Sequence, residues 1–166
     1  VEAGRRYGQE ALALARTLGD RKGEGAALRN LAVADSIAGE HRASIAHAEQ
    51  ALAIFEELGE RERIASSLNV IGVGHRMLNE YDEALQYYER SLAIDRELGN
   101  QVGVARTLSN VGNVHYDRGD FARALEVHRE ALATERELGE KAEISGTLNN
   151  IGIALTDNAA GQLDAW

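Results

Sequence analysis

The sequence predicts an all-α protein built from tandem pairs of antiparallel helices. A Leu-Gly pair followed by a polar residue recurs every forty residues, at Leu18-Gly19, Leu58-Gly59, Leu98-Gly99 and Leu138-Gly139. Within each unit, apolar residues recur at three- and four-residue spacing, the period of a helix that is buried along one face. Self-similarity at a fixed period indicates a repeat architecture.

Each forty-residue unit contains two helical stripes separated by a turn. In the unit 100–139, Arg118-Gly119-Asp120 lies between the stripes, where glycine suits the left-handed residue that ends a helix and aspartate suits the cap of the next helix. We therefore predict a single array over residues 1–166. Its parts are a half repeat at 1–19, full repeats at 20–59, 60–99 and 100–139, the first helix of a further repeat at 140–157, and a truncated tail at 158–166.

Glycine also occurs in the middle of predicted first helices, at Gly72, Gly112 and Gly152. Glycine inside a helix costs about 1 kcal/mol relative to alanine. A close approach of the following helix would offset this cost, and we expect that approach at Ala84 and Ala124.

The composition excludes several classes of function. The chain has 27 acidic and 18 basic side chains and a formal net charge of −9, which argues against binding to nucleic acids or anionic membranes. The absence of cysteine excludes disulfides, thiol nucleophiles and thiolate metal sites. No apolar run is long enough to span a bilayer, so we expect a soluble cytoplasmic protein with no membrane partner.

The residue pattern of each unit resembles the tetratricopeptide repeat. The positions that carry the resemblance in one unit are Leu108, Val111, Gly112, His115, Ala124, His128 and Ala131. The forty-residue period and the absence of proline depart from the usual repeat. This longer form is similar to repeats of kinesin light chain, Pins-type adaptors, Rap-type regulators and STAND-class bacterial regulators. The resemblance implies a right-handed superhelical solenoid whose first helices line a concave groove.

The first helices carry asparagines on the side opposite their buried stripe. Asparagine is a poor helix former, so a row of them needs a reason, and its amide can pair with a peptide backbone as donor and as acceptor. An alternative interpretation is that some amides bridge neighbouring repeats or face water. The predicted ligand-binding residues on this face are Arg29, Asn30, Val33, Asn69, Val73, Arg76, Arg106, Asn110, Asn113, Tyr116, Asn149 and Asn150.

These observations favour a non-catalytic protein–protein interaction module within a larger regulatory or scaffold protein. It would bind a peptide or helix of a partner, or of its own parent chain, in the groove. The first helices are mildly basic, which favours a partner with some acidic residues and apolar anchors.

A structural scaffold is the alternative, since apolar residues such as Leu14 and Ile153 at the repeat ends would lack a neighbour and could form a homo-oligomer. We expect the histidines to be structural, and we expect no catalytic residues, metal or cofactor.

Overall fold

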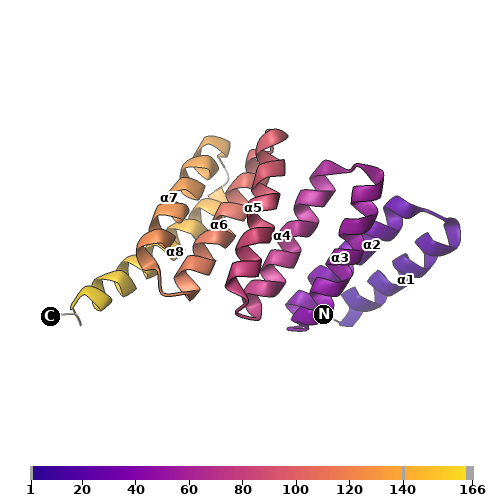
Figure 1. Ribbon diagram of the computed structural model, residues 1–166, viewed down its shortest axis with the longest axis horizontal. Coiled ribbons are helices and arrows are strands. Elements are labelled where there is room, and N and C mark those ends of the chain that lie inside the picture. The colour runs from indigo at the N-terminus through magenta and orange to yellow at the C-terminus, as the bar shows by residue number, and fades with distance from the viewer. Residues whose placement is uncertain (1, 140, 164–166) are drawn as a thin grey trace. The chain divides into compact units, whose positions relative to one another are not determined.

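The structure, a computed structural model, describes residues 2–139 and 141–163. These residues form eight α-helices and no strand (Figure 1). The helices are α1 (Glu2–Leu18), α2 (Arg21–Ile37), α3 (His41–Leu58), α4 (Arg61–Met77), α5 (Tyr81–Glu97), α6 (Gln101–Asp117), α7 (Phe121–Leu138) and α8 (Lys141–Leu163). The predicted all-α fold of antiparallel helix pairs is therefore confirmed. The chain divides within α5 into two compact units, unit 1 (residues 1–94) and unit 2 (residues 95–166).

A left-handed residue follows each of the first seven helices. Asn79 has a φ of 61°, and its side-chain oxygen accepts a 2.9 Å hydrogen bond from the Tyr81 hydroxyl. Glycine tolerates this conformation without steric cost, which is how the chain ends its helices without proline. The residues with positive φ are Gly19, Gly39, Gly59, Asn79, Gly99, Gly119 and Gly139.

Short polar side chains cap the start of three helices. Asp20 accepts a 2.8 Å hydrogen bond from the backbone nitrogen of Gly23 at the start of α2. Asn100 and Asp120 make the equivalent bonds at the starts of α6 and α7. Each cap satisfies a backbone donor that the helix leaves free, and such a cap contributes about 1 kcal/mol.

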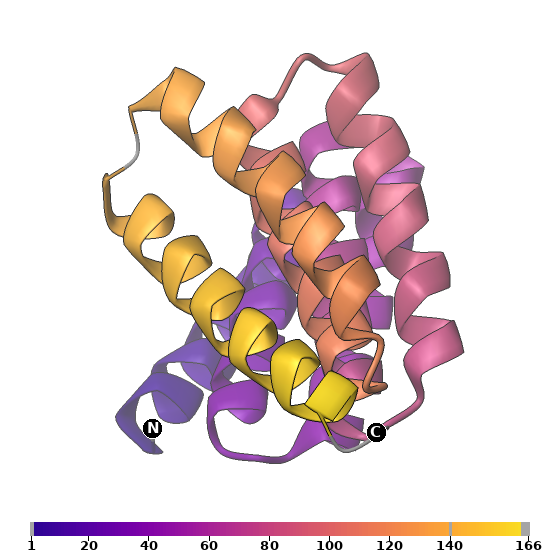
Figure 2. The same ribbon diagram turned by 90° about the vertical axis from the view of Figure 1, so that its left-hand side faces the viewer.

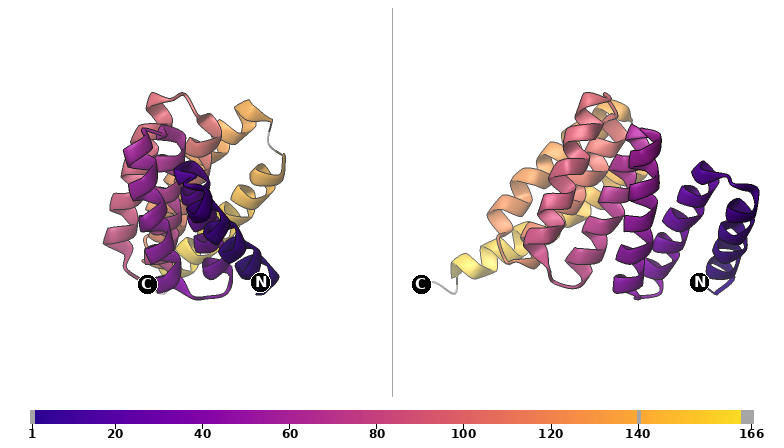
Figure 3. Two further views of the ribbon diagram at one scale, coloured as in Figure 1. Left: turned by 90° about the vertical axis from the view of Figure 1, so that its right-hand side faces the viewer. Right: turned by 45° about the vertical axis from the view of Figure 1, so that its right-hand side comes forward.

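In unit 1, helices α1 to α4 pack in chain order, and α2 also contacts α4 (Figure 3). The core contains Leu28, Phe55, Leu68 and Ile71, all buried. Gly25 lies against the Phe55 ring so closely that a Cβ would sit 2.8 Å from Phe55 Cε1. Because α2 contacts α4, the first helices of these two successive repeats lie beside each other.

A buried carboxylate joins the first three helices. Asp35 on α2 is 1% exposed, and its two oxygens lie 2.9 Å from Arg5 Nε on α1 and 2.7 Å from His47 Nδ1 on α3. A buried charge persists only when it is paired, so both partners help to hold the helices in register.

In unit 2, α6 packs on α7, α7 packs on α8, and α6 contacts α8 (Figure 2).

The mid-helix glycines meet large side chains of the following helix. A Cβ on Gly112 would lie 2.6 Å from His128 Cε1, and one on Gly72 in unit 1 would lie 2.6 Å from Tyr88 Cε1.

The close approach that we expected at Ala84 and Ala124 therefore involves other residues. Both alanines are buried, but the atoms that meet the glycines belong to Tyr88 and His128, one helical turn further along α5 and α7. Residues four apart share a helix face, so the sequence spacing alone does not distinguish them.

Helix α8 runs to Leu163, beyond residue 157, where we expected the first helix of the last repeat to end. The positions that end the earlier first helices hold Gly39, Asn79 and Gly119, whereas the equivalent position here is Ala159. A left-handed alanine costs about 1–2 kcal/mol, which favours continuing the helix. Residues 158–163 of the expected tail are thus helical, while residues 140 and 164–166 lie outside the described residues.

Candidate functional site

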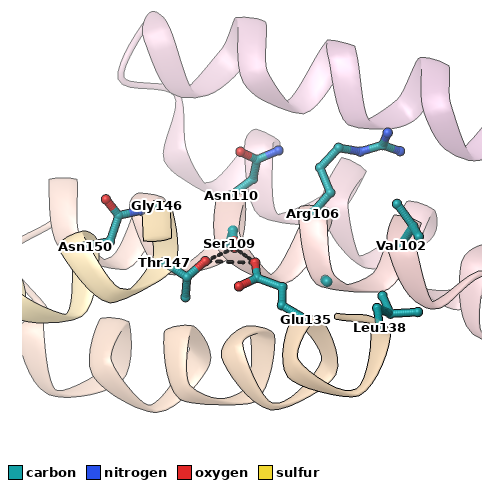
Figure 4. Close-up of a pocket in the computed structure, with 10 residues that line it drawn as sticks. Val102, Arg106, Ser109, Asn110, Glu135, Leu138, Gly146, Thr147 and Asn150 are labelled. Atoms are coloured by element: carbon teal, nitrogen blue, oxygen red, sulfur yellow. Dashed lines mark hydrogen bonds between the residues drawn. The ribbon is translucent and has the colours of Figure 1, made fainter. Parts of the chain in front are cut away.

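A pocket of about 360 Å³ lies between α6, α7 and α8 of unit 2 (Figure 4). Three of the predicted binding residues line it, namely Arg106, Asn110 and Asn150. They come from the sides of α6 and α8 that the sequence assigned to ligand binding. The full lining is Val102, Ala105, Arg106, Ser109, Asn110, Glu135, Leu138, Gly146, Thr147 and Asn150.

A second, smaller pocket of about 50 Å³ continues along the same helices. Its lining includes Asn113, Tyr116, His128 and Ile153, and it shares Asn150 with the first pocket. The side-chain nitrogen of Asn150 donates a 3.2 Å hydrogen bond to the side-chain oxygen of Asn113. This pair therefore agrees with the alternative interpretation, in which amides bridge neighbouring repeats.

Tyr116 also bridges α6 and α8. Its hydroxyl donates a 2.5 Å hydrogen bond to Asp157 Oδ2, and its ring lies 5.3 Å from that of Phe121. The hydrogen bond to the carboxylate, followed by desolvation, raises the pKa of Tyr116 above its ordinary value. The Tyr116 hydroxyl is thus already engaged within the protein.

The remaining predicted residues of unit 2 differ in exposure. Arg106 and Asn149 are exposed, and Asn110 is half-buried and interacts within the protein. Asn149 does not line either of these two pockets. The structure therefore brings Arg106, Asn110 and Asn150 together around one cavity and leaves Asn149 outside it.

In unit 1, the predicted residues on α2 reach the surface. Asn30 and Val33 are exposed. Arg29 is half-buried, and its Nη1 donates a 3.3 Å hydrogen bond to Ser66 Oγ on α4. Arg29 thus links the first helices of two successive repeats.

The predicted residues on α4 are less accessible. Val73 and Arg76 are half-buried, and Asn69 is only 6% exposed. Asn69 also interacts with other groups of the protein. The amide of Asn69 is therefore not accessible to a ligand, whereas Asn30 and Asn149 are exposed.

Our sequence reasoning missed the floor of the larger pocket. Glu135 of α7 and Thr147 of α8 are both 3% exposed, and Val102 and Leu138 supply apolar walls. The signal was present in the sequence, because Glu135 places an acid within an otherwise apolar stripe of the second helix.

The histidines contact nearby side chains or are buried. His75 Nδ1 lies 2.7 Å from Glu80 Oε2, and the His75 ring stacks on Tyr87. Burial lowers the pKa of His128, and desolvation is the main cause that lowers the pKa of His115. Among the described residues, no group of three His, Asp or Glu side chains could hold a metal ion.

No described helix has the length and apolar character needed to cross a bilayer. No curated protein sequence matches the chain.

Several solved structures are similar to the chain. BtubC (BKLC) from P. vanneervenii is 27% identical over 93% of the chain, with a TM-score of 0.80. A Rap protein complexed with the Competence and Sporulation Factor is 19% identical over 97%, with a TM-score of 0.78. A putative kinesin light chain of Podospora anserina is 16% identical over 97%, with a TM-score of 0.71, and the match covers 85% of that chain. The chain spans 65% of the BtubC chain and 48% of the Rap chain.

The family assignment follows from sequence matches that overlap along the array. The family model described as tetratricopeptide repeat matches residues 1–57, 26–97 and 63–137. These matches support a protein–protein interaction module. The match covers far more than half of the sequence, and the chain therefore belongs to the tetratricopeptide repeat family.

Proposed function

We propose that the face of unit 2 formed by α6 and α8 binds a peptide segment or helix of a protein partner, or of a longer parent chain. The observation that carries this proposal is the 360 Å³ pocket, which brings Arg106, Asn110 and Asn150 from two helices around one cavity. Concave sites of this size, with a few placed polar groups among apolar walls, are typical of ligand binding.

Three polar groups at the pocket have a role in this proposal. An amide has two N–H donors and an acceptor oxygen, so Asn150 can pair with a peptide backbone while it donates to Asn113, and Asn110 lines the same cavity. Arg106 is exposed on α6, one helical turn before Asn110, and suits an acidic group of the ligand. The Rap protein that was solved with the Competence and Sporulation Factor supports a ligand-binding role for this fold.

A phage-displayed library of short random peptides tests the proposal. The chain is immobilised, and the affinity of an enriched peptide is then measured by fluorescence anisotropy. The double variant Asn110→Ala/Asn150→Ala should weaken binding about tenfold or more, because two hydrogen bonds to the peptide are lost. Gln50→Ala is the matched control, since Gln50 is an exposed amide on α3 whose side chain bonds to its own helix.

One outcome would contradict the proposed role of the asparagines. If the selected peptides bind the double variant as tightly as they bind the wild type, the asparagines do not hold the ligand. Asn30→Ala extends the test to unit 1, because Asn30 occupies the equivalent position on α2 and is exposed.

Self-association is a second candidate function, favoured by exposed apolar side chains on two helices. Tyr7, Leu14 and Leu18 are exposed on α1, and Leu148 and Leu155 are exposed on α8. Large exposed apolar groups promote association between chains. Light-scattering mass measured over a range of concentrations tests this candidate, and a constant monomer mass would exclude it.

A further inference from the structure

Glu135 is a buried acid on the floor of the larger pocket. It is 3% exposed, and Figure 4 shows it extending from α7 toward α6 and α8. Its Oε1 atom accepts a 2.8 Å hydrogen bond from the Thr147 hydroxyl, with the Ser109 hydroxyl further away at 3.5 Å. One carboxylate oxygen is therefore held by neighbouring helices.

The other oxygen of Glu135 has no such partner. Among the described residues, Oε2 is buried and receives no hydrogen bond. A buried carboxylate oxygen without a donor is costly, because water no longer solvates it and nothing replaces the water. Because Glu135 lines the pocket, a ligand that shifts this side chain toward the cavity would supply the missing donor.

The fold does not require an acid at this position. The equivalent residue two repeats earlier, in unit 1, is Phe55, which is fully buried against Gly25. In the repeat between them the equivalent residue is Asp95, and its Oδ1 accepts a 2.7 Å hydrogen bond from Asn100. The sequence places Glu140 where the earlier repeat has Asn100, so Glu135 lacks that amide donor, and Thr147 holds its Oε1 instead.

The walls around Glu135 suit the hydrocarbon part of a long side chain. Val102 and Leu138 are partly exposed apolar residues, and Ala105 is small and buried. Lysine and arginine carry an apolar stem and a cationic tip, and they pack the stem along such surfaces. A hydrogen bond between a cation and a carboxylate is about twice as strong as one between neutral groups.

We propose that this pocket receives a lysine or arginine side chain of the bound peptide, with Glu135 as the anion that selects it. The inference rests on the proposed function, since it names the residue class that the α6–α8 face recognises. Glu135 acts as a specificity determinant, while Asn110 and Asn150 hold the peptide backbone.

The test uses the same random peptide library with two additional variants. Glu135→Gln keeps the shape of the side chain and removes its charge. Asp95→Asn is the matched control, because Asp95 occupies the equivalent position and is also buried, but it does not line this pocket. Thermal unfolding of each variant checks that the fold is retained.

We expect the wild type and Asp95→Asn to enrich peptides with lysine or arginine at one fixed position, and Glu135→Gln to lose this preference. Replacing that basic residue with norleucine in a selected peptide should weaken binding to the wild type about tenfold. The same replacement should leave binding to Glu135→Gln nearly unchanged.

Two contrary outcomes separate this inference from the proposed function. If the wild type enriches peptides without a basic residue, and Asn110→Ala/Asn150→Ala abolishes their binding, the lysine or arginine site is wrong and the peptide-binding face stands. If no peptide is enriched, or if every variant binds the same peptides equally, both proposals fail.

Discussion

Gly112 lies directly against the imidazole of His128, and a Cβ on Gly112 would be only 2.6 Å from Cε1 of that ring. His128 is 1% exposed and cannot move into solvent without opening the interface between α6 and α7. The same pairing occurs between Gly72 and Tyr88, whereas the first full repeat pairs two small residues, Ala32 and Ala48, both fully buried. A large residue on the second helix is thus accompanied by glycine on the first.

Gly112→Ala should lower the free energy of unfolding by about 1–2 kcal/mol, because overpacking outweighs the better helix propensity of alanine. Chemical denaturation measures the change. Gly152→Ala is the control, since nothing lies within 4 Å of a Cβ at that position of α8. We expect it to be neutral or to stabilise the protein by up to about 1 kcal/mol.

The double variant Gly112→Ala/His128→Ala should lose less stability than the two single variants together, because it reproduces the Ala32–Ala48 pair. Residues in direct contact show coupling energies of about 0.5–3 kcal/mol. Urea denaturation of the four proteins completes the cycle. Strictly additive losses would show that the glycine is not required by the His128 ring.

Gly119→Ala should destabilise the protein by about 1–2 kcal/mol, although there is space for the added methyl group. Nothing lies within 4 Å of a Cβ on Gly119, but its φ is +79°. The cost therefore comes from backbone conformation and not from packing. Gly119→Asn should lose less, because asparagine already occupies the equivalent turn at Asn79 with a φ of 61°. Equal losses for both variants, measured by thermal unfolding, would contradict this explanation.

Stability should fall as the solution becomes mildly acidic. Burial lowers the pKa of His128 below its ordinary value of 6.5, so the folded state holds fewer protons than the unfolded state just below that pH. The contribution of neutral His128 is complete above about pH 6.5 and is lost as the pH falls toward the folded pKa.

His128→Tyr should reduce this pH dependence, since tyrosine fits beside glycine at the equivalent position, Tyr88, and a phenol with a pKa of about 10 stays neutral between about pH 5 and pH 7. The pKa of His115 is also lowered, but His115 is present in both proteins. Its effect on the pH dependence of stability therefore cancels when the wild type and the variant are compared. Urea denaturation at several values between about pH 7 and pH 5 makes the comparison. An unchanged decline in the variant would assign the effect to other groups.

Tyr116 should ionise at a higher pH than a free tyrosine, because its hydroxyl donates to Asp157. Asp157→Asn should bring the pKa of Tyr116 closer to its ordinary value of 10.0. Ultraviolet absorbance of the tyrosinate during a pH titration measures it, with Tyr116→Phe identifying the signal. An identical titration for Asp157→Asn would show that this hydrogen bond does not form in solution.

Much of the fold could be predicted from the sequence because the turns repeat with a strict period. The left-handed residue at Gly119 and the cap at Asp120 lie where the repeat pattern placed them. The end of α8 could not be placed in this way, because Ala159 breaks the pattern of turn residues.

The candidate site was predicted less completely than the fold. Helix periodicity placed Arg106, Asn110 and Asn150 on one face, and they line one pocket. It could not show that Asn69 is buried, since burial depends on what a neighbouring helix presents. Glu135 was missed for a related reason: an acid inside an apolar stripe has no evident role until the cavity beside it is known.

The regular spacing of the left-handed residues, twenty apart from Gly19 to Gly139, determines how such a chain could change its length. Deleting or duplicating forty residues would join equivalent turns. First and second helices would still alternate along the chain. Deleting twenty residues would also join two compatible turns, but it would exchange first and second helices throughout the rest of the chain. The row of asparagines represented by Asn30 and Asn110 would then be interrupted. Evolutionary gain and loss of sequence in this array should therefore proceed in steps of two helices.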